Sequence, residues 1–396
     1  MAADSPVIGI LAGEPSGDSL GRGLMAELRE RFPGARFVGI GGAGMASQGL
    51  ATLVPMNRLA VNGFVDPIRR LPELIGIFRL LLRTFARERP DVFVGVDFNV
   101  FNLLLERRLK QRGIATVHYV SPSVYAWRRG RVRRVARAAD VLLTLFPFEP
   151  AFYAATAVRA VFVGHPLADA IDPSDAGPAA KAAARDALGL SGTGTVVALL
   201  PGSRMSEIRL LGDLFLDTAR ALGVALPDVR FVVPCVRPGV AAWLEEARRR
   251  YQDLALTAYQ GDARRALTAC DVALVKSGTS TLEAMLLERP MVVSYRLGRA
   301  SYLLVRALLR TPYVALPNIL AGRPLVPELL QDAATAPALA AALVSELDKS
   351  RRDPEYLRPF QELHQALRQG ADRRAAAAVA EVVEACRQSV VRARPS

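Results

Sequence analysis

The fold of this chain is decided by residues 7–18, which read Val7-Ile8-Gly9-Ile10-Leu11-Ala12-Gly13-Glu14-Pro15-Ser16-Gly17-Asp18. An unbroken apolar run such as Val7–Ala12 is typical of a strand buried on both faces of a parallel sheet. The glycines that follow allow a tight turn, and Leu20–Arg31 then has helical periodicity. A strand, a glycine turn and a helix in this order predict the first unit of a doubly wound α/β sheet.

The same alternation continues through the first half of the chain and starts again in the second. In the first half we predict strands at Val7–Ala12, Phe37–Ile40, Val92–Val96, Thr116–Val120, Val141–Leu145 and Val161–Val163, with helices at Leu20–Arg31, Pro67–Glu88, Phe101–Arg112 and Gly130–Ala138. In the second half we predict strands at Thr195–Leu200, Arg230–Val233, Leu254–Ala258, Val272–Val275 and Met291–Tyr295. The pattern predicts two parallel-sheet domains of one class.

A boundary falls in residues 172–180, which are rich in Pro, Asp, Gly and Ala as a surface loop would be. From about residue 337 the chain is rich in Ala, Leu and Arg, and no further strand is indicated. We therefore expect domains at 1–171 and 172–340. A helical tail, 341–396, is expected to pack back on an N-terminal domain, its own or a partner's.

The composition fits a globular protein, with 396 residues, 51% of them hydrophobic and 22% charged. Cys235, Cys270 and Cys386 are far apart, which indicates neither a disulfide framework nor a metal site and favours a reducing compartment. The sequence shows no secretion signal and no uncharged apolar stretch long enough to span a bilayer. We expect the protein to be neither exported nor membrane-spanning.

A net charge of +13 indicates an anionic partner, which could be nucleic acid, an anionic membrane surface or an anionic small substrate. The densest basic run is Arg128–Arg137, and no aromatic residues that could stack on bases are interleaved through it. A solvated helix face is therefore favoured over a nucleic-acid site.

Asp97 is the strongest candidate for a general base. Ligands of open α/β sheets bind beyond the carboxyl ends of the strands, and Asp97 directly follows the buried run Val92–Val96. A carboxylate there could accept a proton from a sugar hydroxyl. The alternative is that Asp97 caps the helix that follows. The loop Gly13–Asp18 has the same strand-end position, with a tight turn and a helix cap as its alternative role.

Two loops of the second domain have the composition of phosphate sites. Leu199–Arg204 places a glycine, Ser203 and Arg204 between a strand and a helix. Ser277–Glu283 repeats the arrangement with small residues that open a helix. Backbone amides there could hold a pyrophosphate, and Glu283 could hold the hydroxyls of a ribose.

Several other chemistries do not fit. Gly39, Gly41 and Gly44 have dinucleotide-fingerprint spacing, but they follow the second strand and lack the acidic residue that would hold a ribose. The sequence has no nucleotide P-loop, no HExxH, no GxSxG and no DxD pair. His118, His165 and His364 are scattered, so we expect no required metal and no cofactor.

Five blocks of the sequence, taken together, resemble one family, the lipid-A-disaccharide synthases, which are glycosyltransferases of the GT-B fold. The blocks are Gly13–Asp18, Val117–Trp127, Leu200–Arg204, Ser277–Glu283 and Leu316–Arg323. The resemblance implies two doubly wound, Rossmann-like α/β domains that face each other across a cleft, with a C-terminal helical tail. It also implies transfer of diacylglucosamine from UDP-2,3-diacylglucosamine to the 6-hydroxyl of 2,3-diacylglucosamine 1-phosphate, with inversion and release of UDP.

The resemblance also assigns residues to roles. The catalytic residues would be Asp97 as the base and Arg204 as the group that neutralises the departing pyrophosphate. The UDP-sugar would contact Ser203, Arg204, Glu207, Gly261, Ser277, Gly278, Thr279, Ser280, Thr281, Glu283 and Asn318. The acceptor would lie against Gly13, Glu14, Ser16, Gly17, Asp18, Ser121, Ser123 and Tyr125. Two positions depart from the family, since Val100 replaces a second carboxylate of Asp-Ala-Pro-Asp-Phe-Asn and Tyr125 stands where Trp is more usual.

Acylated substrates require a membrane surface, so the expected location is cytoplasmic and peripheral on the anionic inner membrane. The candidate contact lies within Val61–Arg87 and comprises Phe64, Val65, Ile68, Leu71 and Ile75, with arginines nearby. A helix packed on the sheet would show the same periodicity. A homodimer through the tail is a further expectation. The competing enzyme hypotheses are a UDP-N-acetylglucosamine epimerase and a transferase with a soluble acceptor.

Overall fold

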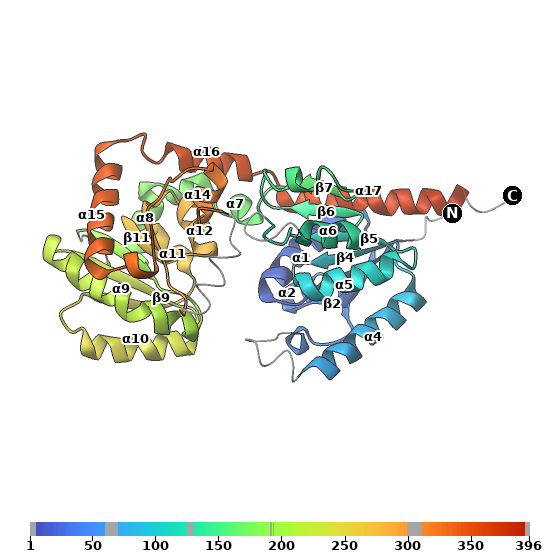
Figure 1. Cartoon of the computed structure of the whole chain (residues 1–396), viewed down its shortest axis with the longest axis horizontal. Helices are drawn as coiled ribbons and strands as arrows, with labels where there is room; N and C mark the ends of the chain where they lie inside the picture. The colour runs from blue at the N-terminus through green and yellow to red at the C-terminus, as the bar shows by residue number, and fades with distance from the viewer. Residues whose placement is uncertain are drawn as a thin grey trace. The chain divides into compact units, whose positions relative to one another are not determined.

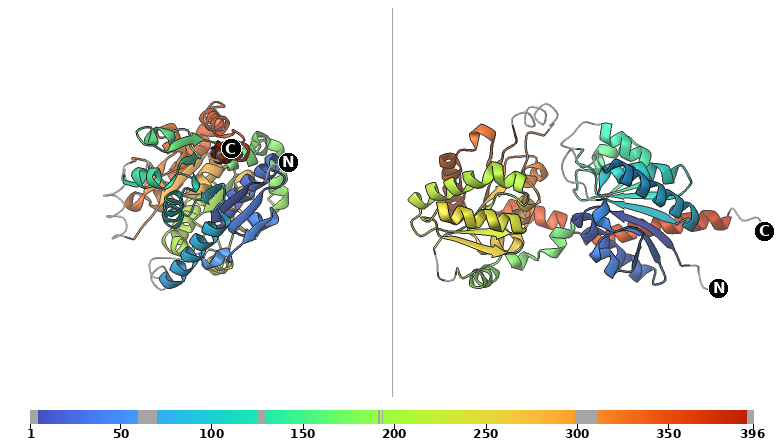
Figure 2. Two further views of the ribbon diagram at one scale, coloured as in Figure 1. Left: turned by 90° about the vertical axis from the view of Figure 1, so that its right-hand side faces the viewer. Right: turned by 90° about the horizontal axis from the view of Figure 1, so that it is seen from below.

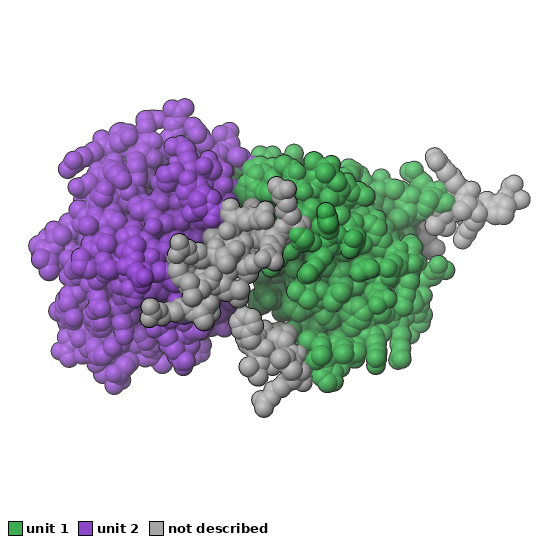
Figure 3. Space-filling model, in the orientation of Figure 1, with its two compact units in different colours: residues 1–169, 367–396 green, residues 170–366 purple. Residues whose placement is uncertain are grey.

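The computed structural model describes residues 5–59, 70–124, 130–190, 192, 194–298 and 311–392 (Figure 1). The chain divides into two compact units. Unit 1 comprises residues 1–169 and 367–396, and unit 2 comprises residues 170–366 (Figure 3). The predicted boundary near residue 172 lies close to the first crossing between the units.

Unit 1 is built on a seven-stranded sheet in its described part, with the order β3-β2-β1-β4-β5-β6-β7. The strands are β1 Val7–Ala12, β2 Arg36–Ile40, β3 Leu50–Thr52, β4 Val92–Val96, β5 Ala115–Tyr119, β6 Val141–Thr144 and β7 Arg159–Phe162. Every pairing is parallel, including β1 with β4, where the strand order reverses. That reversal is the topological switch point, where ligands of such sheets bind.

Helices cover both faces of this sheet because alternate strand residues point to opposite sides. Ile8 and Ile10 join a core with α1 and α17, whereas Leu11 joins a second core with α4 and α5. The helices of unit 1 are α1 Pro15–Arg31, α2 Ala43–Ser47, α4 Leu71–Glu88, α5 Asn99–Lys110, α6 Gly130–Ala138, α7 Pro166–Ala170 and α17 Ala371–Arg392, with 3-10 turns η1 Met56–Arg58 and η2 Pro150–Tyr153.

Unit 2 contains a six-stranded parallel sheet among its described residues, ordered β10-β9-β8-β11-β12-β13. The strands are β8 Val196–Leu200, β9 Arg230–Cys235, β10 Leu256–Gln260, β11 Val272–Lys276, β12 Met291–Tyr295 and β13 Glu328–Leu330. The helices are α8 Pro178–Ala187, α9 Met205–Ala225, α10 Pro238–Arg250, α11 Ala263–Ala269, α12 Thr279–Leu286, α14 Leu316–Ala321, α15 Ala336–Arg352 and α16 Arg358–Leu367, with 3-10 turns η3 Pro173–Ala176 and η4 Gln331–Ala333. The strand order again reverses, here between β8 and β11.

The predicted tail 341–396 is divided between the two units. Helix α15 packs on α9 in unit 2, whereas α17 packs on α1 in unit 1. Figures 1 and 2 show α17, in red, running along unit 1. Its small buried residues, among them Ala375, Ala376 and Val379, allow a close approach to α1 and complete the core on that face. Asp169 accepts hydrogen bonds from the amides of Gly370 and Ala371 and so caps the start of α17.

No helix in the described ranges combines the length and the hydropathy that a bilayer crossing would need.

Candidate functional site

The ends of β4 and β5 in unit 1 carry backbone conformations that side chains rarely adopt. Asp97 and Phe98 both have φ of +48°, and Val120, directly after β5, has φ of +86°. Such values are costly for residues other than glycine and are outliers for a β-branched residue. The Asp97 amide donates to Tyr119 O at 2.8 Å, so the strained turn is tied to the neighbouring strand. Strain at the switch point supports a functional role for this turn.

The Asp97 carboxylate is held by a chain of three side chains. Asn99 Nδ2 donates to Asp97 Oδ1 at 3.0 Å, and Asn99 Oδ1 lies 3.1 Å from His118 Nε2. His118 Nδ1 lies 2.7 Å from Glu106 Oε1, and the His118 and Glu106 side chains are fully buried. Gly95 makes this possible, because a Cβ there would lie 2.0 Å from Glu106 Oε1.

These hydrogen-bonded side chains fix the tautomer of His118. Because the Asn99 amide nitrogen faces Asp97, its oxygen faces His118, and Nε2 must carry a proton. Burial raises the pKa of Glu106, although the charge and hydrogen bond of His118 act in the opposite direction. Glu106 Oε2 also has no hydrogen-bond partner in the described part of the chain. A buried carboxylate oxygen without a partner favours the protonated acid, which can donate to Nδ1 of neutral His118.

The predicted acceptor loop Gly13–Asp18 is partly structural. Asp18 accepts hydrogen bonds from the amides of Gly42, Gly44 and Met45 at 2.7 to 3.0 Å. A protein carboxylate thus occupies amides of the apparent dinucleotide fingerprint, so these amides are not available to the phosphate of a ligand. Gly13 lies against the Phe98 ring, and Gly17 is buried beside β1. Glu14 and Ser16 are exposed at the carboxyl end of β1 and stay available to a ligand.

The loop after β5 contributes one buried and one accessible serine. Ser121 is buried and shares a hydrogen bond with Tyr153 OH at 2.9 Å. Glu149, beside it, is buried and accepts from the amides of Leu145 and Phe146. Burial raises the pKa of Glu149 to about 7, although these amides and Ser121 lower it. Ser123 is half-buried and lines a pocket, and Tyr125 lies outside the described residues.

In unit 2, the backbone amides of the loop after β8 already bind a carboxylate of the protein, that of Glu207. Glu207 Oε2 accepts from the amides of Ser203 at 3.0 Å and Arg204 at 3.2 Å, and Oε1 accepts from Lys276 Nζ at 3.0 Å. Burial acts to raise the pKa of Glu207, but Lys276 and the two amides outweigh it, so the pKa is lowered. Gly202 has φ of +132°, and a Cβ there would lie 2.6 Å from Glu207 Cβ.

Glu207 therefore occupies the amides that the sequence assigned to phosphate. The exposed Arg204 side chain is the part of this loop that can meet a diphosphate.

The second predicted phosphate loop, Ser277–Glu283, follows β11 and includes the start of α12. Ser277 Oγ donates to Val314 O at 2.8 Å, and Thr281 Oγ1 donates to Gly278 O at 2.8 Å. The hydroxyls of these two residues thus shape the turn. The first amides of α12 carry the positive end of its dipole, and among them the Thr281 amide donates to Gly278 O at 3.1 Å. Thr279 is exposed and Ser280 half-buried, so this end of α12 is accessible to an anion.

Glu283 lies beside a second carboxylate in this unit. Burial and the charge of Asp262 raise the pKa of Glu283, while a hydrogen bond from Ser280 and the charge of Arg264 lower it. Gly261 packs against the Tyr259 ring, and the Tyr259 hydroxyl donates to Asp262 O. The arrangement keeps a half-buried carboxyl group one turn into α12, where it could bind hydroxyl groups.

Asn318 is buried and uses its hydrogen-bonding groups within the protein. Its Nδ2 donates to Val326 O and to Glu328 Oε1, and its Oδ1 accepts from the amides of Leu325 and Val326. Glu328 in turn accepts from the amides of Val314 and Ala315. The expected direct contact of Asn318 with a nucleotide does not fit this saturated amide, which instead positions the loop beside α12.

The sequence reasoning missed several of these residues. Asn99, His118 and Glu106 were not connected to Asp97, and Lys276 and Glu328 were not identified at all. The sequence could have identified Lys276 as a candidate site residue, because it directly follows the apolar run Val272–Val275 at a strand end. Groups of three or more His, Cys, Asp or Glu that could hold a metal do not occur in the described portion of the chain.

The predicted membrane contact is described only in part. Leu71 is 52% exposed and Ile75 is 41% exposed. Leu80, on the same helix α4, is 42% exposed. The inner side of α4, with Ile77, is buried in the core. Phe64, Val65 and Ile68 lie outside the described residues.

Comparison with known proteins gives consistent matches. The family profile described as Lipid-A-disaccharide synthetase matches residues 8–382. The Lipid-A-disaccharide synthase of Pseudomonas aeruginosa (strain UCBPP-PA14) is 49% identical over 382 residues, which cover 96% of this chain and 99% of the relative. That of Pseudomonas putida (strain W619) is 49% identical over 94% of this chain and 97% of the relative.

Two solved structures show the same fold at low identity. UDP-GlcNAc 2-epimerase from Neisseria meningitidis, bound to UDP-GlcNAc, has a TM-score of 0.58 at 12% identity and covers 95% of this chain and 99% of its own. The alpha,alpha-trehalose 6-phosphate synthase of Burkholderia multivorans has a TM-score of 0.58 at 14% identity and covers 99% of both chains.

Proposed function

Because this chain belongs to the lipid-A-disaccharide synthase family, we propose that Asp97 in unit 1 deprotonates the acceptor hydroxyl and that the strand-end loops of unit 2 hold the UDP-sugar. The chain is thus a glycosyltransferase of lipid A biosynthesis, and its two parallel α/β sheets have the GT-B architecture. The substrates are UDP-diacylglucosamine and acylated glucosamine 1-phosphate, and the products are the β-1,6 disaccharide and UDP.

The observation that carries the assignment of the base is the strained, braced Asp97 at the switch point of unit 1. A general base must present a lone pair in a fixed direction, and Asn99 holds only one of the two carboxylate oxygens. The second oxygen would accept the proton of the 6-hydroxyl. Val100 at the position of the family's second carboxylate is 80% exposed and carries no charge, which supports a mechanism with a single carboxylate.

The donor half of the proposal rests on the charges of unit 2. The Arg204 guanidinium and the amino end of α12 would stabilise the two negative charges that develop on departing UDP. Lys276, which is paired with Glu207, would add a cation at the same strand ends. Glu283 would bind ribose hydroxyls.

We expect purified protein to release UDP from UDP-2,3-diacylglucosamine only when the acylated sugar phosphate is present. Asp97→Asn keeps the shape of the side chain and its hydrogen bond to Asn99 but removes the base, so turnover should fall by at least about 100-fold. Binding of UDP, measured by calorimetry, should stay unchanged. Full activity of Asp97→Asn would refute the base assignment, and equal activity on deacylated sugars would favour the soluble-acceptor alternative.

Two further proposals concern assembly. We propose that the outer side of α4 rests on an anionic inner-membrane surface, so that the enzyme is peripheral on the cytoplasmic side. We also propose a homodimer in which α17 of each copy packs on the partner's α1, using the contacts that α17 makes within this chain. Light scattering of the full-length protein would give the mass of the dimer, and a monomer at micromolar concentration would contradict it.

A further inference from the structure

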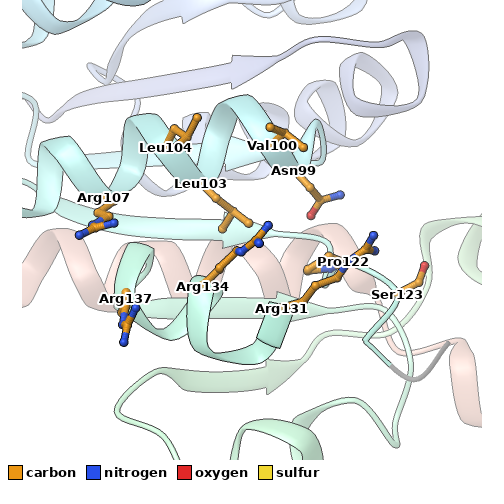
Figure 4. Close-up of a pocket in the computed structure, with 10 residues that line it drawn as sticks. All are labelled: Asn99, Val100, Leu103, Leu104, Arg107, Pro122, Ser123, Arg131, Arg134 and Arg137. Atoms are coloured by element: carbon orange, nitrogen blue, oxygen red, sulfur yellow. The ribbon is translucent and has the colours of Figure 1, made fainter. Parts of the chain in front are cut away.

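A pocket of about 570 Å³ opens on unit 1 between α5, α6 and the loop after β5 (Figure 4). Asn99 stands at one end of its lining, where its amide also holds Asp97. Ser123, from the loop predicted to meet the acceptor, also lines the pocket. The pocket therefore reaches Asn99, the residue that holds the proposed base.

The α5 side of the pocket is apolar and uncovered. Val100 is 80% exposed and Leu104 is 56% exposed, while Leu103 beside them packs against the core below α6. The opposite face of α5, with Leu105 and Leu109, is already buried. Helix α5 thus presents a second apolar face that the fold of unit 1 does not use.

The α6 side of the pocket is basic. The pocket is lined by Arg107 of α5 and by Arg131, Arg134 and Arg137 of α6, and its lining has no acidic side chain in the part that the structure describes. Figure 4 shows the Arg134 side chain reaching from α6 toward Leu103 of α5. Within the described residues, Arg107, Arg134 and Arg137 form no ion pair, whereas Arg36 and Arg159 elsewhere in unit 1 are paired. A ligand could therefore supply the missing negative charge.

An apolar wall facing several guanidinium groups suits an amphiphile with an anionic head. Guanidinium groups bind phosphate through paired hydrogen bonds, and acyl chains bind exposed Val and Leu. Among the described residues of the lining there is no aromatic side chain for a base and no carboxylate for a ribose, which favours an acylated phosphate over a nucleotide.

We propose that this pocket is the acceptor site, in which Arg107 and Arg134 bind the 1-phosphate of the sugar and Val100 and Leu104 contact its acyl chains. The inference rests on the proposed function, since it identifies where the acceptor of that reaction binds. It also gives a role to Val100, which contributes apolar surface where the family more often has a carboxylate.

The test uses full-length protein with both substrates in neutral detergent micelles. For Arg107→Gln/Arg134→Gln we expect the KM of the acylated sugar phosphate to rise by at least about tenfold, as expected for lost charge-assisted contacts, while the KM of the UDP-sugar stays unchanged. The matched control is Arg108→Gln/Arg133→Gln, which removes the same charge from neighbouring exposed positions outside the pocket and should leave both KM values unchanged.

An acceptor analogue with a methyl group in place of the 1-phosphate separates recognition of phosphate from general charge effects. Wild-type protein should prefer the phosphate by at least about tenfold, and the pocket variant should lose most of that preference. Leu104→Asn should raise the acceptor KM for long acyl chains more than for short ones.

Each failure has a distinct meaning. No product from the wild type would refute the proposed function itself. An active wild type whose pocket variant keeps the acceptor KM, or matches the control, would overturn the pocket assignment alone. If the pocket variant loses binding to phosphatidylglycerol vesicles while its micellar acceptor KM is unchanged, the occupant is a membrane lipid and the proposal is wrong.

Discussion

Asn99 connects Asp97 to His118, and each of its two amide atoms serves one of them. The direction of Asp97 therefore depends on a proton on His118 Nε2. Asn99, His118 and Glu106 are positioning residues, because they act on the substrate only through Asp97. Their contribution should appear in kcat and not in the KM of either substrate.

His118→Phe removes the donor to Asn99 while filling the same buried space, and we expect kcat to fall by about 10-fold to 100-fold. Glu106→Gln should keep at least half of kcat, because the glutamine amide can donate to His118 Nδ1 as the protonated acid does. The measurement is steady-state kinetics of both variants, with thermal melting to confirm folding. If kcat of Glu106→Gln falls as far as kcat of His118→Phe, the hydrogen-bonded side chains instead require an ionised Glu106 and a charged histidine.

The raised pKa of Glu149 predicts that the stability of unit 1 depends on pH. Its pKa is raised from 4.5 to about 7 by burial, so the folded state binds the proton more tightly than the unfolded state. Stability from this group is greatest below the unfolded pKa and falls as the pH rises through 7, by on the order of 3 kcal/mol in total.

Guanidinium unfolding at pH 5 and pH 8 tests this expectation. Wild-type protein should lose about 2 to 3 kcal/mol more than Glu149→Gln between these pH values, because glutamine still accepts from the two amides but does not titrate. Burial lowers the pKa of His165 to about 4, which acts in the opposite direction below pH 6.5 but equally in both proteins. Parallel pH profiles would show that Glu149 is not the group responsible.

Among the elements, α4 has a buried core side, and the exposed apolar residues Leu71, Ile75 and Leu80 flank that side. We expect Leu71→Ser/Ile75→Ser/Leu80→Ser to weaken binding to phosphatidylglycerol vesicles by at least about tenfold, because each change removes apolar surface from the lipid contact. Thermal melting should be little changed, since all three side chains are more than 40% exposed.

Two controls define the outcome for α4. Val224→Ser changes an apolar residue in unit 2 that is 85% exposed, and vesicle binding should be unaffected. Ile77→Ser alters the buried side and should destabilise unit 1 by about 2 to 4 kcal/mol. Undiminished vesicle binding of the triple variant would remove α4 from the membrane proposal.

The elements also show how far the sequence could be interpreted. Long apolar runs such as Val92–Val96 predicted the central strands correctly, because strands buried on both faces have no polar period. The short strands β3 and β13 were missed, since three residues carry too little pattern. Asp97 was proposed as a site residue from its position after a strand. Its partners His118 and Glu106 lie within a strand and a helix, where the sequence alone does not show that they meet.

The tail was the least predictable part. Its periodicity indicates helices but not the surface that each helix covers, so α15 and α17 could not be assigned to different units. The assignment of α17 to unit 1 depends on small residues that fit α1 and on the cap from Asp169.

The placement of α17 predicts a sharp positional effect. Ala376→Glu puts a carboxylate into the core of unit 1 and should cost about 3 kcal/mol or more. The neighbouring Ala377→Glu, at a half-buried position, should cost under about 1 kcal/mol. Limited proteolysis with mass spectrometry should show cleavage within residues 5–169 of Ala376→Glu while residues 170–366 stay protected. Equal protection of both variants would mean that α17 does not complete this core.

Because unit 1 takes its last helix from the far end of the chain, it cannot be completed while the ribosome is still making residues 170–366. Unit 2 can fold first, although it comes second in the sequence. Until α17 emerges, the apolar side of α1 stays open to chaperones and to other nascent chains. The order in which the two units are synthesised is therefore opposite to the order in which they can be completed, and translation that stops before residue 371 should leave a folded second half joined to an unfinished first half.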